Sequence, residues 1–199
     1  MGDFLVLANS IKKGGRCLAG ILNPATQNPC LVRIVADENG GALNNNLPVL
    51  GKGNLFLLAP LDVITVSLGQ PVPLPGQPEN IILDSSKQII YRRTEEKSFL
   101  ANFLQNPSSI WGLDSISESN CPSSSLMLLY VANPKISKTY KDYPSLEFDY
   151  NGNHYNIRCT IENFGYKTIP VGVSRCIICV SSGTEYCGAF YKFVAGIIF

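Results

Sequence analysis

Short apolar segments separated by turn residues run through most of this chain and constrain its fold more than any other feature. The Lys-Lys-Gly-Gly turn at 12–15 and the Asn-Gly-Asn turn at 151–153 each separate two such segments, as in a β-hairpin. Similar segments recur after about ten residues, a spacing typical of small β-barrels and sandwiches. The expected strands are 4–11, 16–23, 30–36, 55–68, 80–84, 88–92, 126–132, 146–150, 154–161, 173–180 and 189–198. The pattern therefore predicts a mainly β fold.

One segment in the middle of the chain predicts a helix. Thr94 stands at the N-cap position, and Glu95 and Glu96 suit the positive end of the helix dipole. Apolar side chains recur at helical spacing through 99–104, and Pro107 ends the pattern. A single short helix is therefore expected between two groups of strands.

The residues 114–125, rich in serine, are the best candidate for a linker. We expect a first β unit over 1–93, a helix and connector over 94–125, and a second β unit over 126–199. Two small β-barrels or sandwiches fit this division, because 199 residues suffice for one large domain or two small ones.

Charge and hydropathy exclude several classes of protein. Sixteen basic and fifteen acidic residues leave a net charge of +1, so nonspecific attraction to polyanions is not the main activity. No apolar stretch approaches the length of a membrane span, and the first residues lack the basic and apolar regions of a signal peptide. We expect no membrane partner and a reduced, cytoplasmic compartment.

The densest polar cluster lies around the first turn. Glycines allow a ligand to approach the backbone closely, and basic side chains beside exposed amides suit a phosphate. The alternative is a solvated hairpin tip. The candidate ligand-binding residues of this cluster are Asn9, Ser10, Lys12, Lys13 and Arg16.

Two further groups of residues suit a ligand. Gln77, Glu79 and Asn80 lie in the rigid, proline-framed turn 75–80, where polar side chains either cap the loop or recognise a ligand. Tyrosines and basic residues alternate in the second half, which suits stacking of single-stranded bases as well as ordinary cross-strand packing. The second group comprises Tyr140, Tyr143, Tyr150, Tyr155, Tyr166, Tyr186 and Tyr191, with Lys135, Lys138, Lys141, Arg158 and Lys167.

Catalytic and metal sites have little support in the sequence. Cys17 follows a cation that would favour its thiolate, but His154 is the one histidine and has no evident partner. Cys176 and Cys179 have the spacing of zinc ligands, yet residues three apart on a strand point to opposite faces. We expect no catalytic residue, no metal and no cofactor.

Five ordered motifs resemble the dual OB-containing domain family of bacteria. They are 8–20, 31–35, 61–64, 77–80 and 188–198. The resemblance implies two OB-like barrels packed together, and nucleic-acid or nucleotide recognition. The chain departs from the family pattern at one strand, where the aromatic residue expected before Arg33 is absent and Ile34 replaces a proline.

These observations lead to a hypothesis of non-enzymatic nucleic-acid or nucleotide binding in a groove beside the first hairpin. The hairpin cations would contact phosphate, Arg33 would lie deeper in the groove, and 77–80 would read base or sugar edges. One alternative is a protein-interaction module of a bacterial operon or defence system. The other is a thiol-dependent enzyme using Cys17 and His154.

Overall fold

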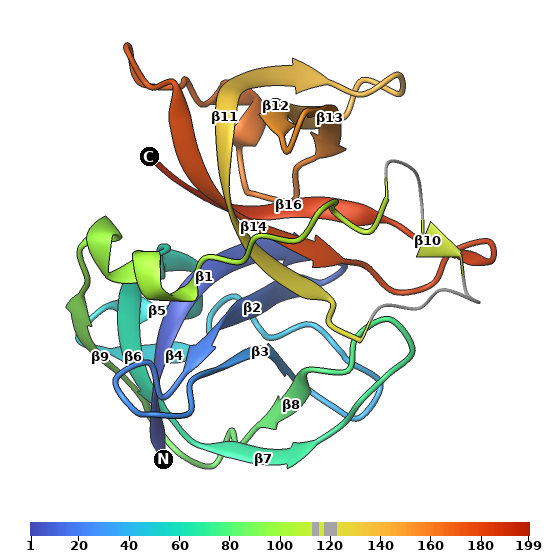
Figure 1. Ribbon diagram of the computed structural model, residues 1–199. Coiled ribbons are helices and arrows are strands. Elements are labelled where there is room, and N and C mark those ends of the chain that lie inside the picture. Colours follow the sequence, from blue (N-terminus) through green and yellow to red (C-terminus); the bar gives the residue numbers. More distant parts are fainter. Residues whose placement is uncertain (113–115, 118–122) are drawn as a thin grey trace. The chain divides into compact units, whose positions relative to one another are not determined.

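The computed structural model describes residues 1–112, 116–117 and 123–199 and divides the chain into two compact units. Unit 1 comprises Met1–Leu74 and Pro78–Leu100, and unit 2 comprises Pro75–Gln77 and Ala101–Phe199. Most of the expected linker lies outside the described residues. The fold is mainly β, as predicted (Figure 1).

Unit 1 is built on one sheet with the strand order β5-β4-β9-β6-β1-β2-β3-β8-β7. Neighbouring strands are antiparallel except for the parallel pairs β3–β8 and β4–β9. The strands are β1 (Gly2–Lys12), β2 (Gly15–Leu22), β3 (Cys30–Val35), β4 (Pro48–Leu50), β5 (Gly53–Asn54), β6 (Asp62–Val66), β7 (Leu68–Pro71), β8 (Asn80–Leu83) and β9 (Ile89–Thr94).

The strand β1 lies near the middle of this sheet. All five side chains from Phe4 to Ala8 are fully buried, so both faces of the strand are covered. A strand buried on both faces has a continuous apolar run, which explains why this stretch does not alternate. Phe4 and Val6 join Leu18 and Ile64 in the core of unit 1.

Unit 2 contains a five-stranded sheet with the order β13-β12-β11-β14-β16 and a short pair of strands, β10 and β15. The predicted hairpin at Asn151 and Gly152 is confirmed, and both residues have the positive φ of a tight turn. The strands are β10 (Ile116–Ser117), β11 (Leu126–Lys138), β12 (Pro144–Tyr150), β13 (Asn153–Arg158), β14 (Arg175–Ser182), β15 (Ala189–Phe190) and β16 (Lys192–Ile198).

The two units share most of their core connectivity, although β14 pairs with β16 whereas β6 pairs with β9 and not with β8. In each, three consecutive strands form an antiparallel meander (β1-β2-β3 and β11-β12-β13), and the next long strand, β6 or β14, pairs with the first. The third strand of unit 1 pairs in parallel with β8, and Cys159, just after β13, forms a parallel bridge to Val194. This is the Greek-key order of an OB-fold. Among the described residues, the strand order of each sheet has two different edge strands, so neither sheet closes on itself as a barrel.

The predicted helix is present but shorter than expected. It is a 3-10 helix, η2 (Lys97–Phe103). It begins later than expected because Thr94 still belongs to β9 and its hydroxyl donates to Asp62 at 2.8 Å instead of capping a helix. Two more 3-10 turns lie in the described residues, η1 (Leu55–Leu57) and η4 (Phe164–Tyr166). The expectation of one strand through 55–68 was therefore wrong, since η1 precedes β6.

Candidate functional site

The hairpin between β1 and β2 has the tight turn that the sequence predicts. Lys12 pairs with Gly15, and Gly14 at the turn has a φ of +83°. The ammonium group of Lys12 donates to the carbonyl oxygen of Gly40, whereas the side chain of Lys13 is exposed to solvent. The two lysines therefore differ: the side chain of Lys12 has an acceptor within the fold, and Lys13 faces water.

Arg16 is a positioned cation within the fold. Only 4% of its surface is exposed, its backbone exchanges two 2.8 Å hydrogen bonds with Leu43, and its Nε donates to Oδ1 of Asn45 at 3.1 Å. Its guanidinium lies 4.7 Å from the ring centroid of Phe56. A Cβ on Gly15 would clash with the carbonyl oxygen of Leu43, so this close approach requires glycine.

The segment that carries Phe56 is held by Asn9. The side-chain amide of Asn9 donates to the carbonyl oxygens of Leu55 and Leu58, at 2.8 and 2.9 Å. Phe56 lies between these two anchor points, and 45% of its surface is exposed. The neighbouring Ser10 is buried in β1. Asn9 therefore orients an exposed aromatic ring at the side of the hairpin.

Arg33, Glu79 and Asn80 meet where β3 and β8 run in parallel. The backbone N–H of Arg33 donates to the carbonyl of Glu79 at 3.0 Å, and its guanidinium donates to Oδ1 of Asn80 at 3.2 Å. Arg33 is 1% exposed and Asn80 is fully buried. The structure thus brings together three of the predicted residues: the buried side chains of Arg33 and Asn80, and the backbone carbonyl of the half-buried Glu79.

Gln77 lies among the residues of unit 2. Its side-chain amide donates to the carbonyl oxygen of Ser182 at 3.2 Å, and it is buried. The preceding Gly76 has a φ of +70° and lies against the ring of Phe190, which leaves no room for a Cβ. The proline-framed turn thus holds Gln77 against the backbone of unit 2.

The structure separates the tyrosines of the second half into two classes. Tyr150 and Tyr155 are buried in the core of unit 2, as cross-strand packing predicts. Others are exposed, and the guanidinium of Arg158 lies 3.8 Å from the ring centroid of Tyr143. The exposed tyrosines include Tyr140 and Tyr166 at 92%, Tyr186 at 68%, Tyr143 at 43% and Tyr191 at 41%.

No group of three or more potential metal ligands occurs among the residues that the structure describes. Cys176 and Cys179 are buried in β14, and burial raises the pKa of the Cys159 thiol well above its usual range.

His154 forms a hydrogen bond with the carboxylate of Asp149, with 2.9 Å between Nδ1 and Oδ1. A hydrogen bond from Asn133 and then the one with His154 lower the pKa of that carboxyl.

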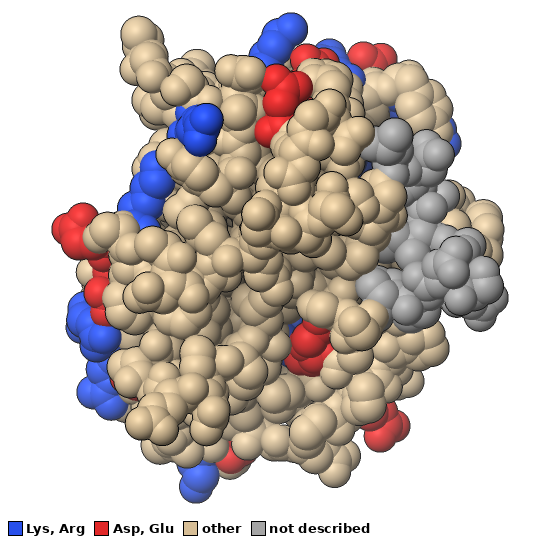
Figure 2. Space-filling view, viewed as in Figure 1, with Lys and Arg blue, Asp and Glu red and all other residues tan. Residues whose placement is uncertain are grey.

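Charged side chains are sparse on the face shown in Figure 2, and basic and acidic groups are interspersed at its margins. No helix of the described chain combines the length and apolar character needed to cross a membrane. On a surface where charges are sparse and mixed, an anion is recognised by a few positioned side chains rather than by a broad positive potential.

In both units a fourth strand pairs with the first strand of a meander, and a later strand lies parallel to the third, as in folds of the oligonucleotide-binding type. The model of the dual OB-containing domain matches residues 3–197, and the chain belongs to this family. The resemblance seen in the sequence is therefore confirmed. A comparison with curated proteins found none that matches the chain.

Phe56 is the component of the candidate site that the sequence did not reveal. It lies in an apolar run that resembles a strand, and its contact with Arg16 depends on the pairing of distant segments. The Asn-Leu-Phe-Leu order at 54–57, with an asparagine before three large apolar residues, was the available signal for a short turn.

Proposed function

We propose that this protein binds nucleic acid or a nucleotide without catalysis, at the surface formed by the β1–β2 hairpin and η1. The observation that carries the proposal is the ring of Phe56, half exposed and backed by the guanidinium of Arg16. Lys12 and Lys13 lie at the tip of the same hairpin. An aromatic platform beside cations suits a base and its phosphate.

The place of this surface in the fold supports the proposal. In OB-folds the loop between the first and second strands is one of the elements that bind oligonucleotides. The exposed ammonium of Lys13 contacts a phosphate, and a base stacks on Phe56. Such stacking contributes about 1–3 kcal/mol per base. Arg16 takes a positioning role, because its Nε is already bonded to Asn45.

The predicted residues around β8 enter the proposal differently. Arg33, Glu79 and Asn80 fasten β8 to β3, and Gln77 fastens the β7–β8 connection to Ser182. In OB-folds the loop between the fourth and fifth strands also borders the ligand. These four residues therefore set the path of that loop, and its exposed atoms would read base or sugar edges.

The test is fluorescence anisotropy with labelled single-stranded and double-stranded DNA and RNA over a salt series. Log affinity for a single strand should fall with log salt, with a slope of about −0.7 for each phosphate contact. The double variant Lys13→Ala/Phe56→Ala should lose most of the binding. Lys87→Ala removes another exposed charge, from the β8–β9 turn, and should bind like the wild type.

Unchanged affinity of the double variant would exclude the hairpin surface. Absence of binding to any of these probes at low salt would overturn the proposed function as a whole.

A protein-interaction role is the second candidate. Leu50 and Leu57 are each about half exposed, near the turn that carries Phe56, and their apolar side chains would suit a protein partner. Replacement of Leu50, which lies in β4 and outside η1, by serine would then abolish capture of that partner and leave the affinity for nucleic acid unchanged.

A further inference from the structure

A second aromatic and basic surface lies on unit 2, at the end of the sheet where β12 begins. Arg158 and Tyr143 are both exposed, and the guanidinium lies 3.8 Å from the ring centroid. This distance is the shortest of the cation–ring contacts in the described residues. A ring stacked by a guanidinium has a fixed orientation, so its contact with a ligand costs little conformational entropy.

The β11–β12 turn holds Tyr143 in place. The backbone N–H of Thr139 donates to the carbonyl of Tyr143 at 2.9 Å, and the N–H of Asp142 donates to the carbonyl of Thr139 at the same distance. Lys138 pairs with Pro144, and Ser145 pairs with Arg158 on the next strand. Tyr143, the residue before β12, thus lies beside Arg158, the last residue of the adjacent strand β13.

The turn η4 adds a second aromatic side chain to this end of the sheet. Phe164 is buried and anchors η4 in the core, and Gly165 lies against Pro144, the residue after Tyr143. Tyr166 and Lys167, which follow, both face solvent.

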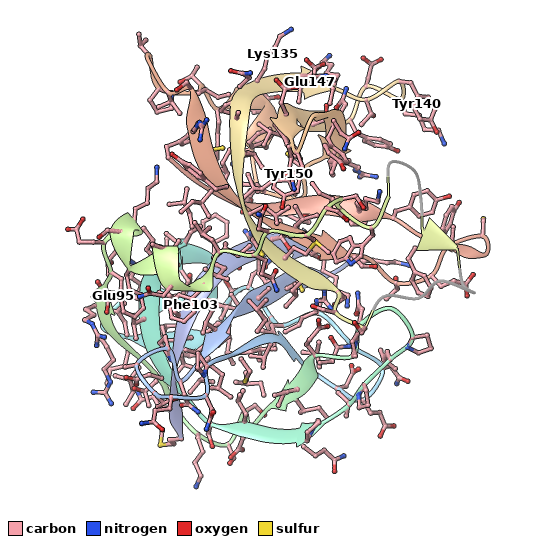
Figure 3. All side chains as sticks on the ribbon, in the orientation of Figure 1. Glu95, Phe103, Lys135, Tyr140, Glu147 and Tyr150 are labelled. Atoms are coloured by element: carbon pink, nitrogen blue, oxygen red, sulfur yellow. The ribbon has the colours of Figure 1, made fainter. Side chains whose placement is uncertain are left out.

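The tip of the β11–β12 turn carries a third tyrosine. Tyr140 is 92% exposed, and the ammonium of Lys141 lies 5.4 Å from its ring centroid. Figure 3 shows Tyr140 on the β11–β12 loop, away from the sheet residues Lys135 and Glu147. We name the six residues of this region the tyrosine surface: Tyr140, Lys141, Tyr143, Arg158, Tyr166 and Lys167.

The chemistry of the tyrosine surface indicates its occupant. It presents three aromatic rings and three cations, and the nearby Asp142 lies 3.7 Å from the ammonium of Lys138. Flat apolar rings interleaved with cations match a ligand that offers flat rings interleaved with anions. Bases within a duplex are already stacked on one another, so only an unpaired strand offers its bases to the tyrosines.

We propose that the tyrosine surface binds single-stranded nucleic acid, with bases stacked on Tyr143 and Tyr166 and phosphates at Lys141, Arg158 and Lys167. This inference rests on the proposed function, from which it takes nucleic acid as the ligand. It adds a preference for single strands and a second binding surface, on unit 2. It needs no contribution from the hairpin surface of unit 1.

The experiment measures binding of a labelled single strand of about 15 nucleotides, within the site sizes usual for such folds, and of the matching duplex. Tyr143→Ala/Tyr166→Ala should weaken single-strand binding by roughly ten-fold or more, since stacking contributes about 1–3 kcal/mol per base. Duplex binding should change little. Tyr143→Phe/Tyr166→Phe should retain the affinity, because both rings remain.

Two matched controls lie elsewhere on unit 2. Tyr186→Ala removes another exposed tyrosine, and Arg175→Ala removes another arginine that lies near an exposed ring. Both should bind the single strand like the wild type. Arg158→Ala should weaken it and reduce the salt slope by about 0.7, the value of one phosphate contact on a single strand.

The outcomes separate the two proposals. If only Lys13→Ala/Phe56→Ala weakens single-strand binding, the tyrosine surface is excluded and the proposed function stands. If only the tyrosine variants weaken it, the further inference holds and the hairpin surface is excluded. Equal losses in Tyr186→Ala, or binding of an acidic polyglutamate peptide in competition with the strand, would overturn the assignment to bases.

Discussion

The guanidinium of Arg16 lies 4.7 Å from the ring centroid of Phe56 and joins the first hairpin to the turn η1. Arg16 is buried and bonded to Asn45, so the ring rests on a fixed support while nearly half of its surface faces solvent. An aromatic side chain held in this way is ready to stack without first losing its freedom.

Replacement of Phe56 by leucine should separate stacking from simple hydrophobic contact. Leucine keeps an apolar side chain but removes the flat ring, so we expect single-strand affinity to fall roughly five- to ten-fold, near the low end for loss of a stacked base. Thermal stability should change little, because the side chain is half exposed. Anisotropy and calorimetry on the same preparation test both parts, and an unaltered affinity would remove Phe56 from the site.

Asn9→Ala should weaken both stability and ligand binding. The substitution leaves the carbonyls of Leu55 and Leu58 without the amide that now donates to them, at a cost of about 1–3 kcal/mol. Phe56 lies between them and should lose its orientation. Urea denaturation gives the first effect and anisotropy the second. Asn9→Asp, which keeps the size but not the donor, should behave no better than alanine.

Removal of the Lys52 ammonium, which pairs with the buried carboxylate of Asp62, should lower the free energy of unfolding. Lys52 donates to Asp62 at 3.1 Å, while the backbone N–H of Ala59 and the hydroxyl of Thr94 supply two further bonds. Lys52→Met keeps the length of the side chain but leaves a buried charge with only neutral partners, which we expect to cost about 2 kcal/mol. Urea denaturation measures it, and Lys87→Met provides an exposed control.

The Asp149 carboxyl should titrate at a higher pH in an Asn133→Ala variant. Its pKa is lowered first by the hydrogen bond from Asn133 and then by the one from His154. A depressed pKa in the folded state means that the stabilisation is present above the unfolded value of about 3.9 and is lost as the pH falls through the folded value. Carboxyl-carbon NMR titration should therefore show the pKa of Asp149 rising in the variant. An identical titration curve would contradict this cause.

Turn residues in the sequence correctly predicted the two hairpins, because a tight turn depends only on residues that are neighbours in the chain. Gly14 and Gly152 both take the positive φ that a tight hairpin needs, and both hairpins form. The helix prediction relied equally on local signals, but Asp62 binds the hydroxyl of Thr94 from another strand. Tertiary hydrogen bonding therefore kept Thr94 in β9 and shortened the helix.

Residue type predicted the candidate site less well, because a sequence does not show which polar groups bond to each other. Arg33 resembles an available cation, yet the parallel pairing of β3 with β8 brings Asn80 to its guanidinium. Conversely, Phe56 resembles a core residue and is half exposed. The common connectivity of the two units was also hidden, since it is a property of strand pairing rather than of residue identity.

Three residues of the β7–β8 connection belong to unit 2, so the polypeptide passes from one unit to the other three times, after Leu74, Gln77 and Leu100. No single cut, and no single gene boundary, therefore yields two whole units. A fragment that begins at Ala101 would lack the amide of Gln77 that now satisfies the Ser182 carbonyl. Any fragment made by a single cut therefore lacks residues of one unit or carries residues of the other.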